Sequence, residues 1–140
     1  MSQHPLQPVI NRIVPIRFER GLQALSPAER NVFLVWCYPA AVNDGGHASF
    51  FYNTQGEFAH ETVQALEEIG APEYGKLLDR AIDLFPDRSV PRDIEERNAA
   101  LSALPDDSDE RLEKLDDEFY ALGDDELLSR LTVYWNRHNG

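Results

Sequence analysis

Cysteine is nearly absent from this chain of 140 residues, which contains only Cys37. No disulfide can form within the chain, and a lone cysteine fits a reducing compartment better than a secreted, disulfide-bonded framework. Cys37 follows the apolar run 32–36. This position favours a buried, inert thiol over a nucleophile.

Long apolar segments are missing as well. No stretch approaches 18 apolar residues, and the segment 1–14 lacks a basic region followed by a continuous apolar one. These absences predict a soluble, cytoplasmic protein with no membrane partner. A chain of 140 residues is long enough for one domain, which buries roughly 65–70% of the surface that its unfolded chain exposes.

The common catalytic and metal-binding signatures are also absent. The sequence has no Gly-x-Gly-x-x-Gly, phosphate-binding loop, Gly-x-Ser-x-Gly or Cys-x-x-Cys pattern, and the pair His60-Glu61 lacks the second histidine of a zinc-protease motif. Carboxylates are too numerous for one acid/base pair to be singled out. We therefore expect a non-enzymatic protein with no catalytic residues, no cofactor and no metal.

Strand patterns and internal repeats are not found, whereas apolar residues recur at helical spacing. The clearest stripe consists of Leu112, Leu115, Phe119 and Leu122. The pattern predicts an all-α fold, a single-domain bundle of six to eight helices. Residues 1–25, interrupted by three prolines, are expected to form an arm or short helix packed on the core, and residues 26–140 the helical domain.

Capping residues and prolines divide this domain into segments. The sequence 26–29 predicts a helix start with a capping box and proline in the first turn. That helix is expected to bend near Pro39 and to end at 43–46, before a short aromatic segment at 47–52. Further helices are expected over 57–69, 71–85, 91–104 and 109–122, and from Asp124 onward. Residues 105–108 are expected to cap the helix 109–122. Gly70 and Gly123 are expected to terminate the helices that precede them.

The negative charge is confined to the second half of the chain. Residues 1–60 are neutral overall, so residues 61–140 carry the whole net charge of −12. The segment 105–126 alone holds eleven carboxylates, offset only by Arg111 and Lys114. Such a field argues against direct binding of nucleic acid and favours basic protein partners. The candidate partner-binding residues are Asp106, Asp107, Asp109, Glu110, Glu113, Asp116, Asp117, Glu118, Asp124 and Asp125.

Within 109–122 the carboxylates occupy the arc that the apolar stripe leaves open. Glu110, Glu113 and Asp117 follow one another at three and four residues, which places neighbours ~5–6 Å apart. Phosphates along one nucleic-acid strand have a comparable separation. Like charges at this spacing destabilise a helix by ~0.2–0.5 kcal/mol per pair, so a fold that keeps them has a use for the surface. The alternative interpretation is an acidic face that serves solubility alone.

The most distinctive local string is 43–53, with two glycines followed by paired aromatic residues. Glycines permit a sharp reversal with positive φ, and asparagine and aspartate side chains bind turn amides. We interpret the string as a structural motif. Its members are Asn43, Asp44, Gly45, Gly46, Phe50, Phe51 and Asn53, with Gly70 as a later helix terminator. The alternative is a small site built from Asp44, His47 and His60, although their spacing matches no zinc signature.

Residues 42–53, followed by 59–71, resemble the bacterial DNA-mimic protein family. Members of that family carry an Asn-Gly-Gly-type turn, an aromatic pair, an asparagine, and then a helix that ends in a Leu-x-x-Ile-Gly-Ala-like sequence. Residues 115–120 are similar to a further Leu-Asp-x-x-Phe-Tyr element. Asp44 departs from the pattern, because a second asparagine is frequent at that position. The resemblance covers residues 26–135.

The resemblance implies an acidic helical protein whose carboxylates imitate DNA phosphates. Such a protein occupies the DNA-binding face of a transcription factor or another basic DNA-binding protein. The acids expected to assist are Asp79, Asp83, Asp87, Glu95 and Glu96. A second hypothesis is an immunity-type or adaptor protein that binds one basic partner through shape as well as charge.

Aromatic residues in the helical segments are expected mainly in the core, while those at helix ends are candidates for the interface of a homodimer. They are Phe50, Phe51, Tyr52, Phe58, Tyr120, Tyr134 and Trp135.

Overall fold

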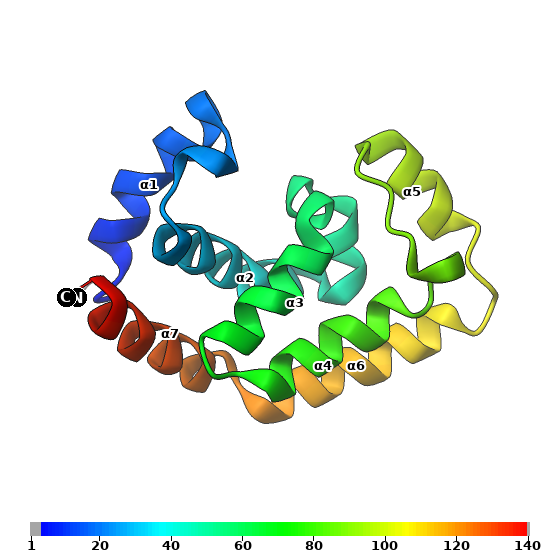
Figure 1. Cartoon of the computed structure of the whole chain (residues 1–140). Coiled ribbons are helices and arrows are strands. Elements are labelled where there is room, and N and C mark those ends of the chain that lie inside the picture. Colours follow the sequence, from blue (N-terminus) through cyan, green and yellow to red (C-terminus); the bar gives the residue numbers. More distant parts are fainter. Residues whose placement is uncertain (1–3, 140) are drawn as a thin grey trace.

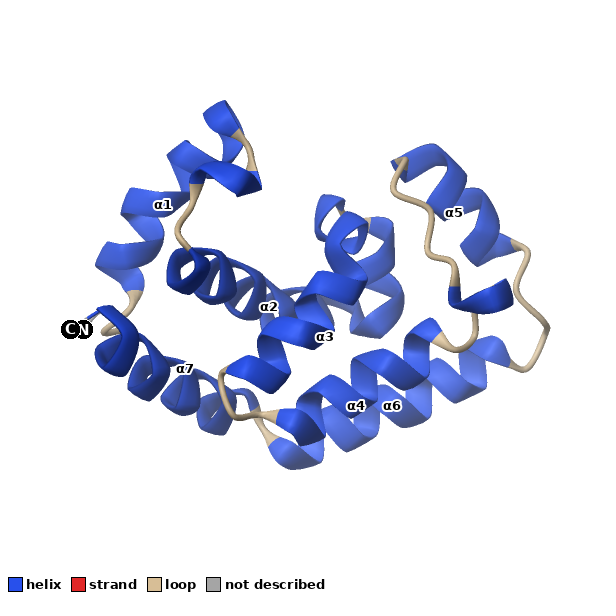
Figure 2. Ribbon diagram, in the orientation of Figure 1, coloured by secondary structure: helices blue, strands red, loops and turns tan. Residues whose placement is uncertain are grey.

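The computed structural model describes residues 4–139, apart from the side chains of Gln55 and Asn139. Over these residues the chain forms seven α-helices and three short 3-10 helices, with no strand (Figure 2). The predicted all-α, single-domain bundle is therefore confirmed. Residues 1–3 and Gly140, at the ends of the expected arm and domain, lie outside the described residues. In the described part, no helix combines the length and the apolar character needed to span a membrane.

The N-terminal region forms one helix, α1 (Gln7–Arg20). The prolines of this region do not divide it into short pieces. Pro8 lies in the first turn, where a missing N–H costs no hydrogen bond, and Pro15 removes only one bond from the middle of the helix. Core packing stabilises the helix despite that loss. The buried apolar side chains of this region are Leu6, Ile10 and Ile13.

After the short helix η1 (Leu22–Ala24), α2 spans Pro27–Tyr52. It begins with the predicted capping box between Ser26 and Glu29. The backbone leaves helical geometry at Gly45 and Gly46 rather than near Pro39. The expected helix end at 43–46 is thus a kink, and the expected aromatic segment 47–52 is a continuation of the helix.

The remaining helices follow the predicted order, most of them with shorter bounds. They are η2 (Thr54–Phe58), α3 (Ala59–Glu68), α4 (Pro72–Ile82), η3 (Pro86–Arg88), α5 (Ile94–Ser102), α6 (Ser108–Leu122) and α7 (Asp124–Asn139). Gly70 and Gly123, which follow α3 and α6, have φ of +87° and +86°. Asp107 occupies the N-cap position of α6, but its side chain makes no capping hydrogen bond; it pairs with Arg111 instead.

Helix α2 is the centre of the molecule, because it contacts α1, α3, α5, α6 and α7. Helices α4 and α6 lie side by side along one edge (Figure 1). The largest fully buried aromatic side chains are Phe33, Tyr38, Phe50, Phe51, Tyr74, Phe85 and Phe119. Two aromatic residues expected mainly in the core are exposed instead, Tyr52 at 46% and Tyr120 at 51%.

The buried Arg97 connects α5 to the end of α2. Its side chain is 1% exposed. Nε donates to the carbonyl of Phe51 (2.7 Å) and Nη2 to that of Asn53 (2.8 Å). Nη1 donates to the carbonyls of Pro91 (3.0 Å) and Arg92 (2.9 Å). Desolvation lowers the pKa of Arg97, and the four carbonyls compensate for the lost water.

Candidate functional site

Acidic side chains predominate on the solvent face of α6, where Arg111 and Lys114 are exposed as well. Leu112, Leu115 and Phe119 are buried on the opposite side, as the sequence spacing predicted. Leu122, the fourth residue of the predicted stripe, is 38% exposed instead, at the last turn of the helix. Glu110, Glu113 and Asp117 are exposed. At 3.6 residues per turn, these three carboxylates lie within an arc of about 60°. The helix therefore presents one continuous acidic strip to solvent.

Six of the candidate carboxylates make no hydrogen bond or ion pair with any described residue. We call these the free carboxylates. They are Asp106, Asp109, Glu110, Glu113, Asp117 and Asp125. All six are exposed. Their charges face water and are available to an incoming cation.

The other four candidates have partners. Asp107, just before α6, pairs with Arg111 (2.9 Å). Glu118 pairs with Arg80 of α4 (3.1 Å), and Asp124 accepts a hydrogen bond from the side-chain amide of Asn43 in α2 (2.9 Å). The pairs Asp107–Arg111 and Glu118–Arg80 are exposed ion pairs, which contribute little to stability. The two arginines do offset the charge that Asp107 and Glu118 present to a partner. The neutral amide of Asn43 occupies one oxygen of Asp124 without offsetting its charge.

Asp116 is the fourth, and it lies largely inside the fold. Its Oδ1 accepts a hydrogen bond from the backbone N–H of His47 (2.8 Å) and lies 2.6 Å from His47 Nδ1. The other ring nitrogen, Nε2, lies 2.7 Å from the hydroxyl of Tyr38. The side chain of His47 is fully buried, and burial raises the pKa of Tyr38 well above its ordinary value. Asp116 therefore joins α6 to α2.

The kink in α2 creates the space for this contact. Gly46 has φ of +78°, and a Cβ there would lie 2.2 Å from Oδ2 of Asp116. Only glycine allows both the backbone conformation and the close approach. Tyr120 adds a further link, because its hydroxyl donates to the carbonyl of Val42 (3.1 Å). The string 43–47 thus positions α6 against α2.

The alternative small site is not assembled in the structure. Asp44 accepts a hydrogen bond from Ser49 Oγ (3.3 Å), and His60 Nε2 donates to the carbonyl of Arg88 (3.1 Å). His47 is buried beside Asp116. Across the described residues, no three histidine, cysteine or acidic side chains are placed to hold a metal ion. Cys37 is partly buried, and burial raises the pKa of its thiol to about 12.

Comparison with known proteins supports the resemblance seen in the sequence. Residues 23–138 match the model of the DMP19-like protein family. The chain belongs to this family. No curated protein and no solved structure matches it. The part of the DMP19-like chain that matches begins shortly before α2 and includes both the kink and the acidic helix α6.

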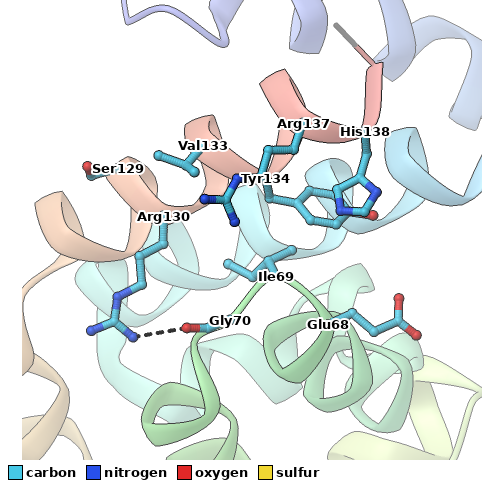
Figure 3. A pocket seen from close by; sticks show the side chains of 9 residues that line it. All are labelled: Glu68, Ile69, Gly70, Ser129, Arg130, Val133, Tyr134, Arg137 and His138. Carbon is cyan, nitrogen blue, oxygen red and sulfur yellow. Dashed lines mark hydrogen bonds between the residues drawn. The ribbon is translucent and has the colours of Figure 1, made fainter.

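The DMP19-like chain also has a cavity with basic side chains, of about 370 Å³, between the end of α3 and the last turns of α7 (Figure 3). Arg130 and Arg137 line it. Arg130 donates to the carbonyl of Gly70 (3.2 Å) and to both carboxylate oxygens of Glu73 (2.6 and 3.0 Å). The end of α7 and the start of α6 lie at opposite ends of the molecule (Figure 1). This cavity is therefore separate from the acidic strip.

Proposed function

We propose that this protein is a DNA-mimic regulator. Its free carboxylates bind the DNA-binding face of a basic protein, such as a transcription factor, and prevent that protein from binding DNA. The observation that carries the proposal is the strip of free carboxylates Glu110, Glu113 and Asp117 on α6, in a chain of the DMP19-like family.

The geometry suits this role because the strip is held on a rigid element. Residues three and four apart on a helix lie ~5–6 Å from each other, so lysine and arginine side chains that grip successive phosphates can grip successive carboxylates. The buried side chains of α6 and the contact between Asp116 and His47 hold the helix in place. Such preorganised charge favours fast and selective association with a basic surface.

The proposed protein acts by binding, without catalysis, and works in the cytoplasm. Membership in the DMP19-like family supports the absence of an enzymatic role. Because the contacts are exposed and ionic, affinity for the partner should fall steeply with salt. An immunity-type or adaptor protein that recognises its partner mainly by shape would instead bind with weak salt dependence.

The test is the triple variant Glu110→Gln, Glu113→Gln and Asp117→Asn. We expect it to bind the partner at least tenfold more weakly, while circular dichroism shows an unchanged fold. A control variant, Glu19→Gln with Glu67→Gln, removes exposed charge from α1 and α3 and should change affinity less than twofold. Unchanged affinity in the folded triple variant would exclude the strip from the binding surface.

A further inference from the structure

A cavity of about 350 Å³ lies where α5, the start of α6 and the end of α2 meet. Its apolar wall includes Tyr52, Leu104 and Leu112. Its charged groups are Asp106 and Asp109, both free carboxylates. No basic residue lines it. Two other cavities differ in this respect, since one contains Arg130 and Arg137 and the other contains Arg80, Arg111 and Lys114.

Ser108 gives this cavity a second, independent feature. The residue lines the cavity and is 3% exposed. Its buried hydroxyl makes no hydrogen bond with any group in the described part of the chain. A buried hydroxyl without a partner lowers stability, so the packing of α6 alone does not account for a serine here. Ser108 is thus a residue of the cavity lining whose hydroxyl oxygen still lacks a donor from the described residues.

We infer that this cavity receives a lysine or arginine side chain of the basic partner. The inference rests on the proposed function. Long basic side chains combine an apolar stem with a charged head. The stem fits the wall formed by Tyr52 and Leu104, and the head donates to Asp106, Asp109 and the hydroxyl of Ser108. The ring of Tyr52, which is 46% exposed, offers a further contact for a cation.

The cavity adds what an acidic strip lacks. Exposed ion pairs form in many geometries and are screened by salt. A partly enclosed site with an apolar wall selects one side chain in one position. The strip on α6 then accounts for the electrostatic attraction, and the cavity beside its first turn fixes the register of the partner.

The experiment uses the full-length, ¹⁵N-labelled protein and two small probes at 150 mM salt. N-acetyl-arginine amide carries the cationic head, and N-acetyl-citrulline amide has nearly the same shape without the charge. We expect saturable shifts of the amide signals of Tyr52 and of residues 102–104 and 106–109 with the arginine probe alone. Equal shifts with both probes, or no saturable shift at these residues, would overturn the inference.

Two variants that remove the same charge separate the cavity from the general field. Asp106→Asn with Asp109→Asn should weaken binding of the arginine probe at least fivefold, whereas Glu113→Gln with Asp117→Asn should weaken it less than twofold. Equal weakening would show that only the overall charge matters. Ser108→Ala should weaken the probe about threefold without lowering the melting temperature, because it removes a hydroxyl that has no partner. Unchanged probe affinity in this variant would exclude the hydroxyl from the site.

The outcomes for the cavity and for the proposed function can be distinguished. The probe titration involves neither the partner nor DNA. If the arginine probe binds as expected but DNA does not compete with the partner, the cavity stands and the mimic function fails. If DNA competes with the partner but the two double variants weaken the probe equally, the mimic function stands and the cavity inference fails.

Discussion

Asp116 accepts a hydrogen bond from the backbone N–H of His47 through the same oxygen, Oδ1, that lies 2.6 Å from the His47 ring. We predict that Asp116→Ala lowers the free energy of unfolding by about 1–3 kcal/mol, because it leaves buried donors of His47 without an acceptor. The measurement is urea denaturation. Asp117→Ala, one residue further along but exposed, should change it by less than about 0.5 kcal/mol. Equal effects would show that the contact does not hold α6.

Gly46 is coupled to Asp116 by their close approach. We predict that Gly46→Ala destabilises the protein by about 1–3 kcal/mol, because the new Cβ meets Oδ2 of Asp116 and the backbone has positive φ. In the background of Asp116→Ala the penalty should be smaller, since the clashing atom is gone while the positive φ remains. A double-mutant cycle measures this difference. Strict additivity would contradict the proposed coupling.

Arg97 should be essential for stability although it is not part of the acidic strip. Arg97→Met leaves four backbone carbonyls without their donor, so we expect a loss of about 3 kcal/mol or more. Chemical denaturation measures the loss. The control is Arg92→Met, whose parent side chain is exposed and pairs with Glu61 (2.9 Å). If Arg92→Met lowers the free energy of unfolding as much as Arg97→Met does, the four hydrogen bonds of Arg97 do not have the stabilising role proposed here.

The pair Glu73–Arg130 makes stability depend on pH. Hydrogen bonds from Arg130 lower the pKa of Glu73 from its ordinary value of 4.5. The folded state therefore binds a proton on the Glu73 carboxylate less tightly than the unfolded state does. The contribution of this pair to the stability of the fold is complete above pH 4.5, and it is lost as pH falls through the lowered pKa of Glu73. Glu73→Gln should narrow the difference in melting temperature between pH 7 and pH 3, compared with the unmodified chain.

A second carboxylate, Glu29, serves as a reference in this comparison of melting temperatures at pH 7 and pH 3. The backbone N–H of Ser26 lowers the pKa of Glu29, so Glu29 contributes with the same sign. The Glu73→Gln variant should therefore keep part of the acid sensitivity. An unchanged pH dependence in that variant would show that Glu73 and Arg130 are not coupled in solution.

Local features of the fold were predictable from the sequence, whereas distant contacts were not. The capping box at Ser26 and Glu29 and the stripe on α6 depend on residues within one or two turns, so the sequence shows them directly. At the kink, Gly46 lies against Asp116, which is on another helix. In the sequence alone this contact is not visible, and two adjacent glycines indicate a helix end. Arg97 was missed because a polar helix gives no sign that its arginine reaches the carbonyls at the end of α2.

In the candidate site, too, local features were predictable from the sequence and distant contacts were not. Helical spacing predicts that Glu110, Glu113 and Asp117 share a face, and the structure places all three on the solvent side of α6. Spacing does not show which neighbouring acids have partners. The contacts of Asp116 with His47 and of Glu118 with Arg80 join residues far apart in the chain. The free carboxylates could therefore be distinguished only in the folded protein.

The most direct test of the central claim is a competition experiment on the immobilised full-length protein. Cytosol from the source cells is passed over it at low salt, and bound proteins are released first by duplex DNA and then by a salt gradient. We expect a DNA-binding protein that duplex DNA displaces and that the triple variant Glu110→Gln, Glu113→Gln and Asp117→Asn fails to retain. Retention of no basic protein, or of one that saturating DNA leaves bound, would contradict the DNA-mimic function.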